Sequence, residues 1–202
     1  MPVSAEDSGL NRLIEELSNA NPATRASAAA EIFRCGFDVA HAAVALWLLD
    51  AQLAGCLCLS ETGGPKATVG IAVERGTFDR IRAANGSPRL ANVPDDQDAE
   101  EFELDFPGGV RLDILTTRQA GAGGAIDKFL RRFGEGIQQV EFETRDVGRA
   151  TEILRSRFGI APIYPQTRAG ADGTRVNFFL VPAAPGKLLI ELVETPGSLH
   201  ES

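Results

Sequence analysis

Two acidic residues occupy matching places in the second half of the sequence. Asp113 lies in a Leu-Asp-Ile segment and Glu191 in an Ile-Glu-Leu segment, and both segments alternate like β-strands. On another expected strand, alternation puts Glu141 on the same face as Gln139. Carboxylates gathered on one face of a sheet can act as a base in proton transfer or recruit a cation. The sequence therefore predicts acid–base or cation chemistry at these residues.

Two arginines flank the glycine-rich segment Gly-Ala-Asp-Gly. Arg168 precedes this segment and Arg175 follows it, and Asn177 shares the strand face of Arg175. A guanidinium can bind a substrate carboxylate or phosphate through a bidentate fork, which predicts a substrate-binding role for the arginines. The alternative is an ion pair with Asp172 or with another neighbouring acid.

The same polar residues also have a simpler interpretation. A sheet that is covered on one side only leaves its other side in water, so polar side chains alternate with apolar ones along each strand. Composition alone favours this solvated face over a ligand-binding cleft.

Bulk composition excludes several classes of function. The chain has 202 residues and a formal charge of −8, which argues against a nucleic-acid partner and disfavours anionic membrane surfaces. The apolar stretch 39–59 is long enough to span a membrane, but it carries Asp50, and we interpret it as a buried helix. The N-terminus has no signal-peptide pattern, and three cysteines suit a reducing cytoplasm.

The first 60 residues read as helices. Leu10, Leu13 and Leu17 fall on one helical face, and Asn21-Pro22 supplies an N-cap and a first-turn proline. Gly36 is expected to end this second helix, and a third helix is expected from Asp38 to Leu57. The segments LNRLIEEL and NPATRASAAAEIFRCG resemble a single HEAT-type helical hairpin. One such unit cannot bury its own apolar face, so we expect it to pack on the rest of the chain or on a second subunit in a homodimer.

A repeat follows the linker Glu-Thr-Gly-Gly-Pro. Each copy has a strand, a helix and three further strands, and each ends in the apolar-acid-apolar pattern described above. In the first copy the segments are 67–73, 76–86, 88–93, 100–106 and 110–116. In the second copy they are 137–144, 146–159, 161–166, 174–181 and 187–194.

These patterns predict an α+β fold by duplication. We expect two βαβββ modules that form an open, eight-stranded, barrel-like sheet, preceded by a small all-α extension. The expected parts are a helical extension (1–60), a first module (66–117), a crossover linker and helix (118–135) and a second module (136–196).

Residues 67–195 resemble the vicinal oxygen chelate superfamily, which includes glyoxalase I, methylmalonyl-CoA epimerase, extradiol dioxygenases and bleomycin-resistance proteins. The resemblance is strongest to methylmalonyl-CoA epimerase. It is carried by AIDKFLRRFGEGIQQVEF, GADGTRVNFFLVP and KLLIELVE, which follow the epimerase order of crossover helix, strand, glycine-rich turn and closing strand. The helical extension has no counterpart in the typical epimerase.

The resemblance implies a divalent metal held by the first and last strands of both copies. The first-strand positions, which are histidines in the family, fall on Thr68 and Gln139. The last-strand positions fall on Asp113 and Glu191. In the family the metal polarises the carbonyl of a thioester, and a carboxylate removes the neighbouring C–H proton.

Both histidines of this chain, His41 and His200, lie outside the two copies. An oxygen-only donor set suits hard, labile ions, so the resemblance implies at most a weakly held Mn, Mg or Co ion. The implied metal ligands are Asp113, Gln139 and Glu191, and the implied catalytic residues are Glu191 and Asp113. The implied substrate-binding residues are Gln139, Glu141, Arg168, Arg175, Asn177 and Thr68.

Three functions agree with these features. The first is an epimerase-like or glyoxalase-like enzyme with a small-molecule cleft and proton transfer next to a carbonyl. The second is a metal-free ligand-binding protein like the bleomycin-resistance members. The third is a protein-interaction module whose cleft has decayed.

Overall fold

The computed structural model describes residues 5–60, 63–183 and 186–195, and these fall into two compact units. The first unit comprises Met1–Gly36 and Val69–Gln138, and the second comprises Phe37–Thr68 and Gln139–Ser202. The helical extension is therefore divided: its first part belongs with the first module and its second part with the second module.

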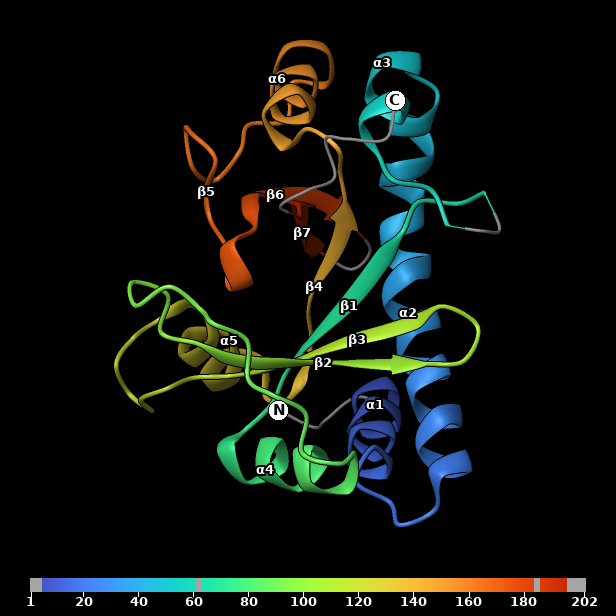
Figure 1. The fold of residues 1–202 in the computed structure, drawn as a ribbon, viewed down its shortest axis with the longest axis vertical. Coiled ribbons are helices and arrows are strands. Elements are labelled where there is room, and N and C mark those ends of the chain that lie inside the picture. The colour runs from blue at the N-terminus through green and yellow to red at the C-terminus, as the bar shows by residue number, and fades with distance from the viewer. Residues whose placement is uncertain (1–4, 61–62, 184–185, 196–202) are drawn as a thin grey trace. The chain divides into compact units, whose positions relative to one another are not determined.

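The extension contains helices α1 (Ala5–Glu16), α2 (Pro22–Leu48) and α3 (Ala51–Cys56) (Figure 1). Asn21 caps α2 as predicted, because its Oδ1 accepts the N–H of Ala23 at 2.9 Å. The expected break at Gly36 and the expected third helix from residue 38 to 57 were wrong, because α2 continues through both positions.

Close packing explains the glycine inside α2. A Cβ atom at Gly36 would lie 2.8 Å from Cγ1 of Val69, so the lack of a side chain lets the helix approach the first strand of its unit. The helix start that the sequence assigned to Asp38 instead occurs after Asp50, whose Oδ1 accepts the N–H groups of Gln52 and Leu53 at 2.9 and 3.0 Å. Among the described helices, none is long and apolar enough to cross a membrane.

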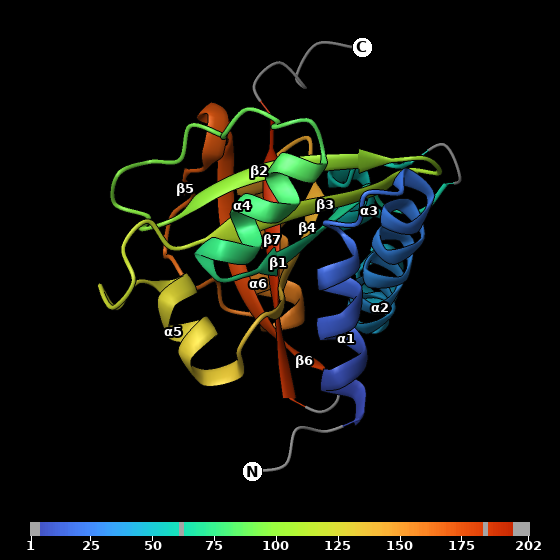
Figure 2. The ribbon, with the colours of Figure 1, turned by 90° about the horizontal axis from the view of Figure 1, so that it is seen from below.

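The first unit contains most of β1 (Ala67–Ala72), with α4 (Arg75–Ala84), β2 (Glu100–Phe106), β3 (Val110–Thr116) and α5 (Ala125–Phe133). Its strands are ordered β2-β3-β1, with β3 antiparallel to β2 and parallel to β1. Figure 2 shows α4 lying across β2 and β3. The rings of Phe78 and Phe102 meet there at 4.8 Å, so this face of the sheet is the core of the unit.

The second unit contains most of β4 (Gly136–Glu143), with α6 (Val147–Phe158), β5 (Arg168–Ala169), β6 (Arg175–Ala183) and β7 (Gly186–Glu194). The strand order is β4-β7-β6-β5. Strand β7 is parallel to β4 and antiparallel to β6. Helix α6 contacts β6 and β7, and it begins at the N-cap Asp146 and ends at Gly159 in the left-handed conformation.

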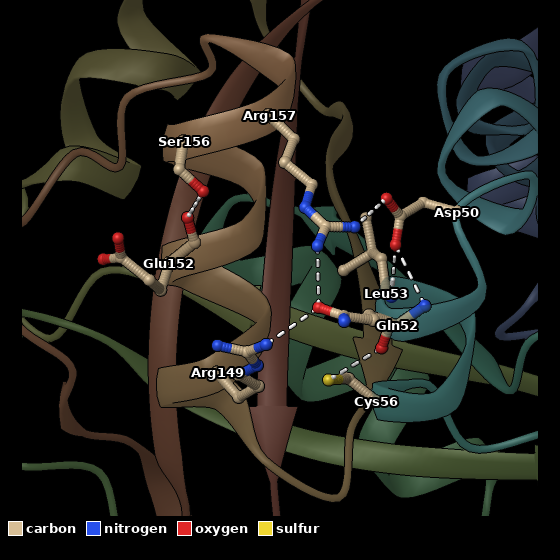
Figure 3. Close-up of polar contacts among 8 residues, drawn as sticks. All are labelled: Asp50, Gln52, Leu53, Cys56, Arg149, Glu152, Ser156 and Arg157. Carbon is tan, nitrogen blue, oxygen red and sulfur yellow. Dashed lines mark hydrogen bonds and ion pairs between the residues drawn. The ribbon is translucent and has the colours of Figure 1, made fainter.

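The second part of the extension docks on α6 and beside β4. Backbone hydrogen bonds join Cys58 N–H to the Glu143 carbonyl (2.9 Å) and Arg145 N–H to the Cys56 carbonyl (2.8 Å). Figure 3 shows the polar contacts between α3 and α6, where the Oε1 atom of Gln52 accepts hydrogen bonds from Arg149 and Arg157. Of the three leucines expected on one face, Leu17 is buried, whereas Leu10 and Leu13 are half-buried. Val44, Trp47 and Leu53 of the extension are buried as well.

The modules are duplicated as predicted, although the described residues form seven strands instead of eight. The segment 88–93 is not a strand, although the Ala91 N–H donates a hydrogen bond to the Glu101 carbonyl of β2 at 2.9 Å. In the second module only the two-residue strand β5 and an isolated bridge at Pro162 are found in place of the expected strand. Prolines in or next to both segments lack the backbone N–H that a β-ladder needs, which explains why so few of their residues pair with a neighbouring strand.

Strand registers confirm that Asp113 and Glu191 are equivalent. Asp113 on β3 is the parallel partner of Gly70, which lies two residues after Thr68. Glu191 on β7 is the parallel partner of Glu141, which lies two residues after Gln139. In each module, the acid of the last strand therefore pairs with the residue two positions after Thr68 or Gln139 on the first strand.

Candidate functional site

The second unit contains a buried carboxylate paired with an amide. Glu191 is 8% exposed and Gln139 is 6% exposed, and they lie on the neighbouring strands β7 and β4. The Nε2 atom of Gln139 donates to Oε2 of Glu191 at 2.5 Å. A charge-assisted bond of this kind fixes the carboxylate and favours its ionised form.

A second carboxylate lies beside this pair. Glu141 is the register partner of Glu191 across the parallel strands, so both side chains project from the same face. Glu141 is half-buried. Two neighbouring carboxylates favour the uptake of a proton or of a cation between them.

The other flank of Glu191 is apolar. Its partner on the antiparallel strand β6 is Phe178, and Leu180 projects from the same face two residues later. The ring of Tyr164 meets Phe178 edge-to-face, with centroids 6.0 Å apart. Sequence alternation does not predict these neighbours, because it identifies the two faces of one strand but not which face lies beside the acid of the next strand.

The register separates Arg175 and Asn177 from Glu191. Their partners on β7 are Glu194 and Leu192, so both side chains belong to the face opposite to that of Glu191. Arg175 forms an ion pair with Glu194 at 3.2 Å. Asn177 is fully buried, and its amide donates to the Tyr164 carbonyl at 3.3 Å. Arg175 therefore follows the second interpretation given for it, an ion pair with a neighbouring acid. The partner is Glu194 and not Asp172.

Arg168 lies next to the apolar flank. Its Cζ atom is 4.4 Å from the centroid of the Tyr164 ring, a cation–π contact. Since Tyr164 also contacts Phe178, Arg168 is the arginine that the structure brings to the Phe178 side of the second unit.

In the first unit, Asp113 is half-buried on β3. Its antiparallel partner is Glu103, which forms a 3.6 Å ion pair with Arg111 on the same face. Thr68, at the start of β1, is 1% exposed and belongs to the second unit. This first-unit face has the alternating charges of a solvated sheet surface.

The cysteines of the extension are poor candidates for chemistry. Burial raises the pKa of the Cys56 thiol, and burial likewise raises the pKa of Cys58. Both thiols therefore remain protonated at neutral pH, which disfavours nucleophilic attack and metal ligation.

Solved structures similar to this chain include several methylmalonyl-CoA epimerases, whereas no family model and no curated protein matches it. The epimerase from Mycobacterium tuberculosis is 31% identical, with a TM-score of 0.54 over 65% of this chain and 88% of the enzyme. The chain belongs to the vicinal oxygen chelate superfamily.

Two further epimerase structures support this assignment. A variant of the Streptomyces coelicolor enzyme in complex with 2-nitronate-propionyl-CoA is 25% identical, with a TM-score of 0.53 over 66% of this chain and 98% of the enzyme. An epimerase in complex with methylmalonyl-CoA and NH4+ is 26% identical, with a TM-score of 0.53 over 66% of this chain and 96% of that enzyme. The helical extension accounts for the unmatched part of the chain.

The donors of this superfamily member do not fit a transition-metal site. Among the described residues, no group of three His, Cys, Asp or Glu side chains could hold a metal ion. His41 is exposed on α2, and His200 lies outside the described residues. In the second unit the amide N–H of Gln139 faces the Glu191 carboxylate, so the two side chains form a donor–acceptor pair rather than two oxygens converging on a cation.

Proposed function

We propose that the protein catalyses proton transfer at a carbon next to a carbonyl, as an epimerase-like enzyme, with Glu191 as the base. The observation that carries this proposal is the buried Glu191 carboxylate held by Gln139 at 2.5 Å. A base must be held at a fixed position, and the amide donor holds the carboxylate there. The similarity to epimerases that bind acyl-CoA compounds supports a thioester as the substrate class.

The chemistry needs no oxidant or co-reactant. The Glu191 carboxylate takes the proton from the carbon, and the C–H electron pair passes into the carbonyl group as an enolate. Glu141, as the register partner of Glu191, is placed to exchange this proton with water. Return of a solvent proton to the carbon regenerates the thioester, with either configuration.

Arg168 is proposed to meet the anionic part of the substrate, since it lies on the Phe178 side of the unit. Arg175 and Asn177 are proposed to act indirectly, through the ion pair with Glu194 and the hydrogen bond to Tyr164. The roles predicted for Asp113 and Thr68 stay predictions. The assays with EDTA and added ions described below test for a weakly held Mn, Mg or Co ion.

The test is the entry of solvent deuterium into acyl-CoA thioesters in heavy water, followed by NMR or mass spectrometry. Glu191→Gln should lower the exchange rate by about 10²- to 10⁴-fold, the usual contribution of a general base. The matched control is Glu152→Gln, which changes an exposed residue of α6 and should exchange at the wild-type rate. Unchanged exchange in Glu191→Gln would refute the proposed base.

Gln139 is a positioning residue, so its variant needs a separate readout. Gln139→Leu should shift the pH profile of exchange to higher pH, because the carboxylate loses a donor that stabilises its ionised form. A loss of rate with an unchanged pH profile would show a purely structural role. Parallel assays with EDTA and with added Mn, Mg or Co show whether an ion contributes.

A metal-free ligand-binding protein is the second candidate. The donor–acceptor arrangement of Gln139 and Glu191 favours it, because the pair does not chelate. This function replaces the enzyme if acyl-CoA compounds bind saturably but exchange no proton with any of these ions.

A further inference from the structure

We infer that the substrate carries a bulky apolar group, branched alkyl or aryl, on the carbon that loses the proton. This inference rests on the proposed function and adds the substrate class. It is carried by four apolar residues at and around Phe178, the cross-strand partner of Glu191. They are here called the apolar wall: Ile163, Tyr164, Phe178 and Leu180.

The apolar wall lies directly against the proposed base. Phe178 is the cross-strand partner of Glu191, and partners of this kind have Cβ atoms about 5 Å apart. Leu180 follows on the same face of β6, opposite Leu189 of β7. A carbon that gives its proton to Glu191 would therefore place one of its substituents against Phe178 and Leu180.

The apolar wall is exposed, although it lies beside a buried carboxylate. Ile163 is 45% exposed, Leu180 is 49% exposed and Tyr164 is 37% exposed. Covering such side chains with an apolar ligand releases about 25 cal/mol for each Å² removed from water. The exposed side chains of the apolar wall therefore favour an apolar acyl group over a short polar one.

The loop that carries Ile163 and Tyr164 is fixed before any ligand arrives. The Ile163 N–H donates to the Phe178 carbonyl at 2.7 Å. Tyr164 is held at its carbonyl by the Asn177 amide and on its ring face by Arg168. A surface that is fixed in this way loses little conformational entropy when a ligand binds.

Charge also disfavours an acidic substituent at this carbon. A carboxylate there, as in methylmalonyl-CoA, would approach the Glu191 carboxylate, and like charges at short range repel. A neutral alkyl or aryl group avoids this repulsion and fills the apolar wall. The geometry therefore predicts a preference for 2-aryl- or 2-alkyl-acyl thioesters.

The single tyrosine of the chain provides a direct probe of this surface. Protein labelled with ¹³C-tyrosine gives the ring signals of Tyr164 alone. Titration with 2-phenylpropanoyl-CoA should shift these signals saturably through the ring current of the bound phenyl group, whereas methylmalonyl-CoA should not. In the exchange assay, 2-phenylpropanoyl-CoA should exceed methylmalonyl-CoA by about 10- to 200-fold in kcat/KM, the range that apolar pockets usually reach.

The matched variants are Leu180→Asn and Leu49→Asn. Both replace an exposed leucine, so both should fold, but Leu49 lies in the turn that follows α2 and is 82% exposed. Leu180→Asn should lower the preference for the aryl thioester several-fold, and Leu49→Asn should leave it unchanged. Equal preferences in the two variants would overturn the inference.

The two readouts separate this inference from the proposed function. A Tyr164 shift with no deuterium exchange supports the apolar subsite and refutes the enzyme. Exchange that is fastest with methylmalonyl-CoA, without a Tyr164 shift from the aryl thioester, supports the enzyme and overturns the subsite. Absence of both signals overturns both.

Discussion

At the level of single residues, Gly36 lies inside a helix that a glycine would be expected to end, because its missing side chain makes room for a neighbouring strand. It lies inside α2, where a Cβ atom would be 2.8 Å from Val69. Gly36→Ala should therefore destabilise the protein by about 1–3 kcal/mol, the usual cost of overpacking. Urea unfolding followed by circular dichroism measures this change.

Gly55 provides the matched control for Gly36. It lies in α3 with no heavy atom within 4 Å of a built Cβ. Gly55→Ala should stabilise the protein by roughly 0.5–1 kcal/mol, because alanine is the better helix former. A stabilising Gly36→Ala would show that α2 can move away from Val69.

At the scale of elements, one carboxylate organises the glycine-rich loop before α5. Asp127 accepts hydrogen bonds from the N–H groups of Gly121 (2.9 Å) and Gly123 (3.0 Å). The Gly121 hydrogen bond is the largest of the contacts that lower the pKa of Asp127 below its ordinary value. The loop glycines therefore serve a structural turn, in agreement with their interpretation as linker residues.

This lowered pKa predicts a stability that depends on pH. A carboxyl whose folded pKa lies below its unfolded pKa stabilises the fold at pH values above the unfolded pKa, about 3.9 for Asp. The stabilisation is lost as the pH falls through the folded pKa. Asp127→Asn should thus lower the Tm at pH 7, and the difference from wild type should shrink below about pH 4.

Differential scanning calorimetry at several pH values tests the Asp127 prediction. Asp79→Asn, at an exposed residue of α4, is the control and should change the Tm little at any pH. A Tm deficit of Asp127→Asn that stays constant down to pH 2 would contradict an effect of the ionised carboxylate.

Packing rather than polar contact should hold α3 on α6. Gln52 is exposed, so its hydrogen bonds to Arg149 and Arg157 are open to water, whereas Leu53 is fully buried. Leu53→Ala should cost about 2–5 kcal/mol, and Gln52→Ala should cost less than about 1 kcal/mol. Equal costs, measured by urea unfolding, would show that the polar cluster of Figure 3 anchors the helix.

At the scale of the whole molecule, the extension is a part of both cores. Ile14, Leu17 and Ile32 are fully buried in the first unit, and Trp47 and Leu53 are buried in the second. Deletion of residues 1–60 should therefore expose apolar surface and reduce solubility. The expected signs are strong binding of the dye ANS and a lower Tm.

The deletion also has a site-specific consequence. Since α3 packs on α6 and residues 57–58 pair beside β4, the deletion should increase amide hydrogen exchange in both elements. A truncated protein that melts and exchanges like the full chain would show that the extension is merely tethered. Its resemblance to a HEAT hairpin stays a prediction.

The sequence by itself determined the duplicated α+β modules and the equivalence of Asp113 and Glu191, because strand alternation and shared closing patterns are local properties of the chain. It also determined the candidate acids, since residue type alone gives their chemistry. Local patterns misplaced the end of α2, because Gly36 is explained by Val69, a distant residue.

Only the tertiary structure decided which residues surround Glu191. The register of β6 on β7 places Phe178 beside it and turns Arg175 and Asn177 to the other face. Side chains alternate between the two faces of a sheet, so a shift of β6 by one residue against β7 would give Glu191 a different set of neighbouring side chains. That register is set by the packing of entire strands, and no single segment of the sequence contains it.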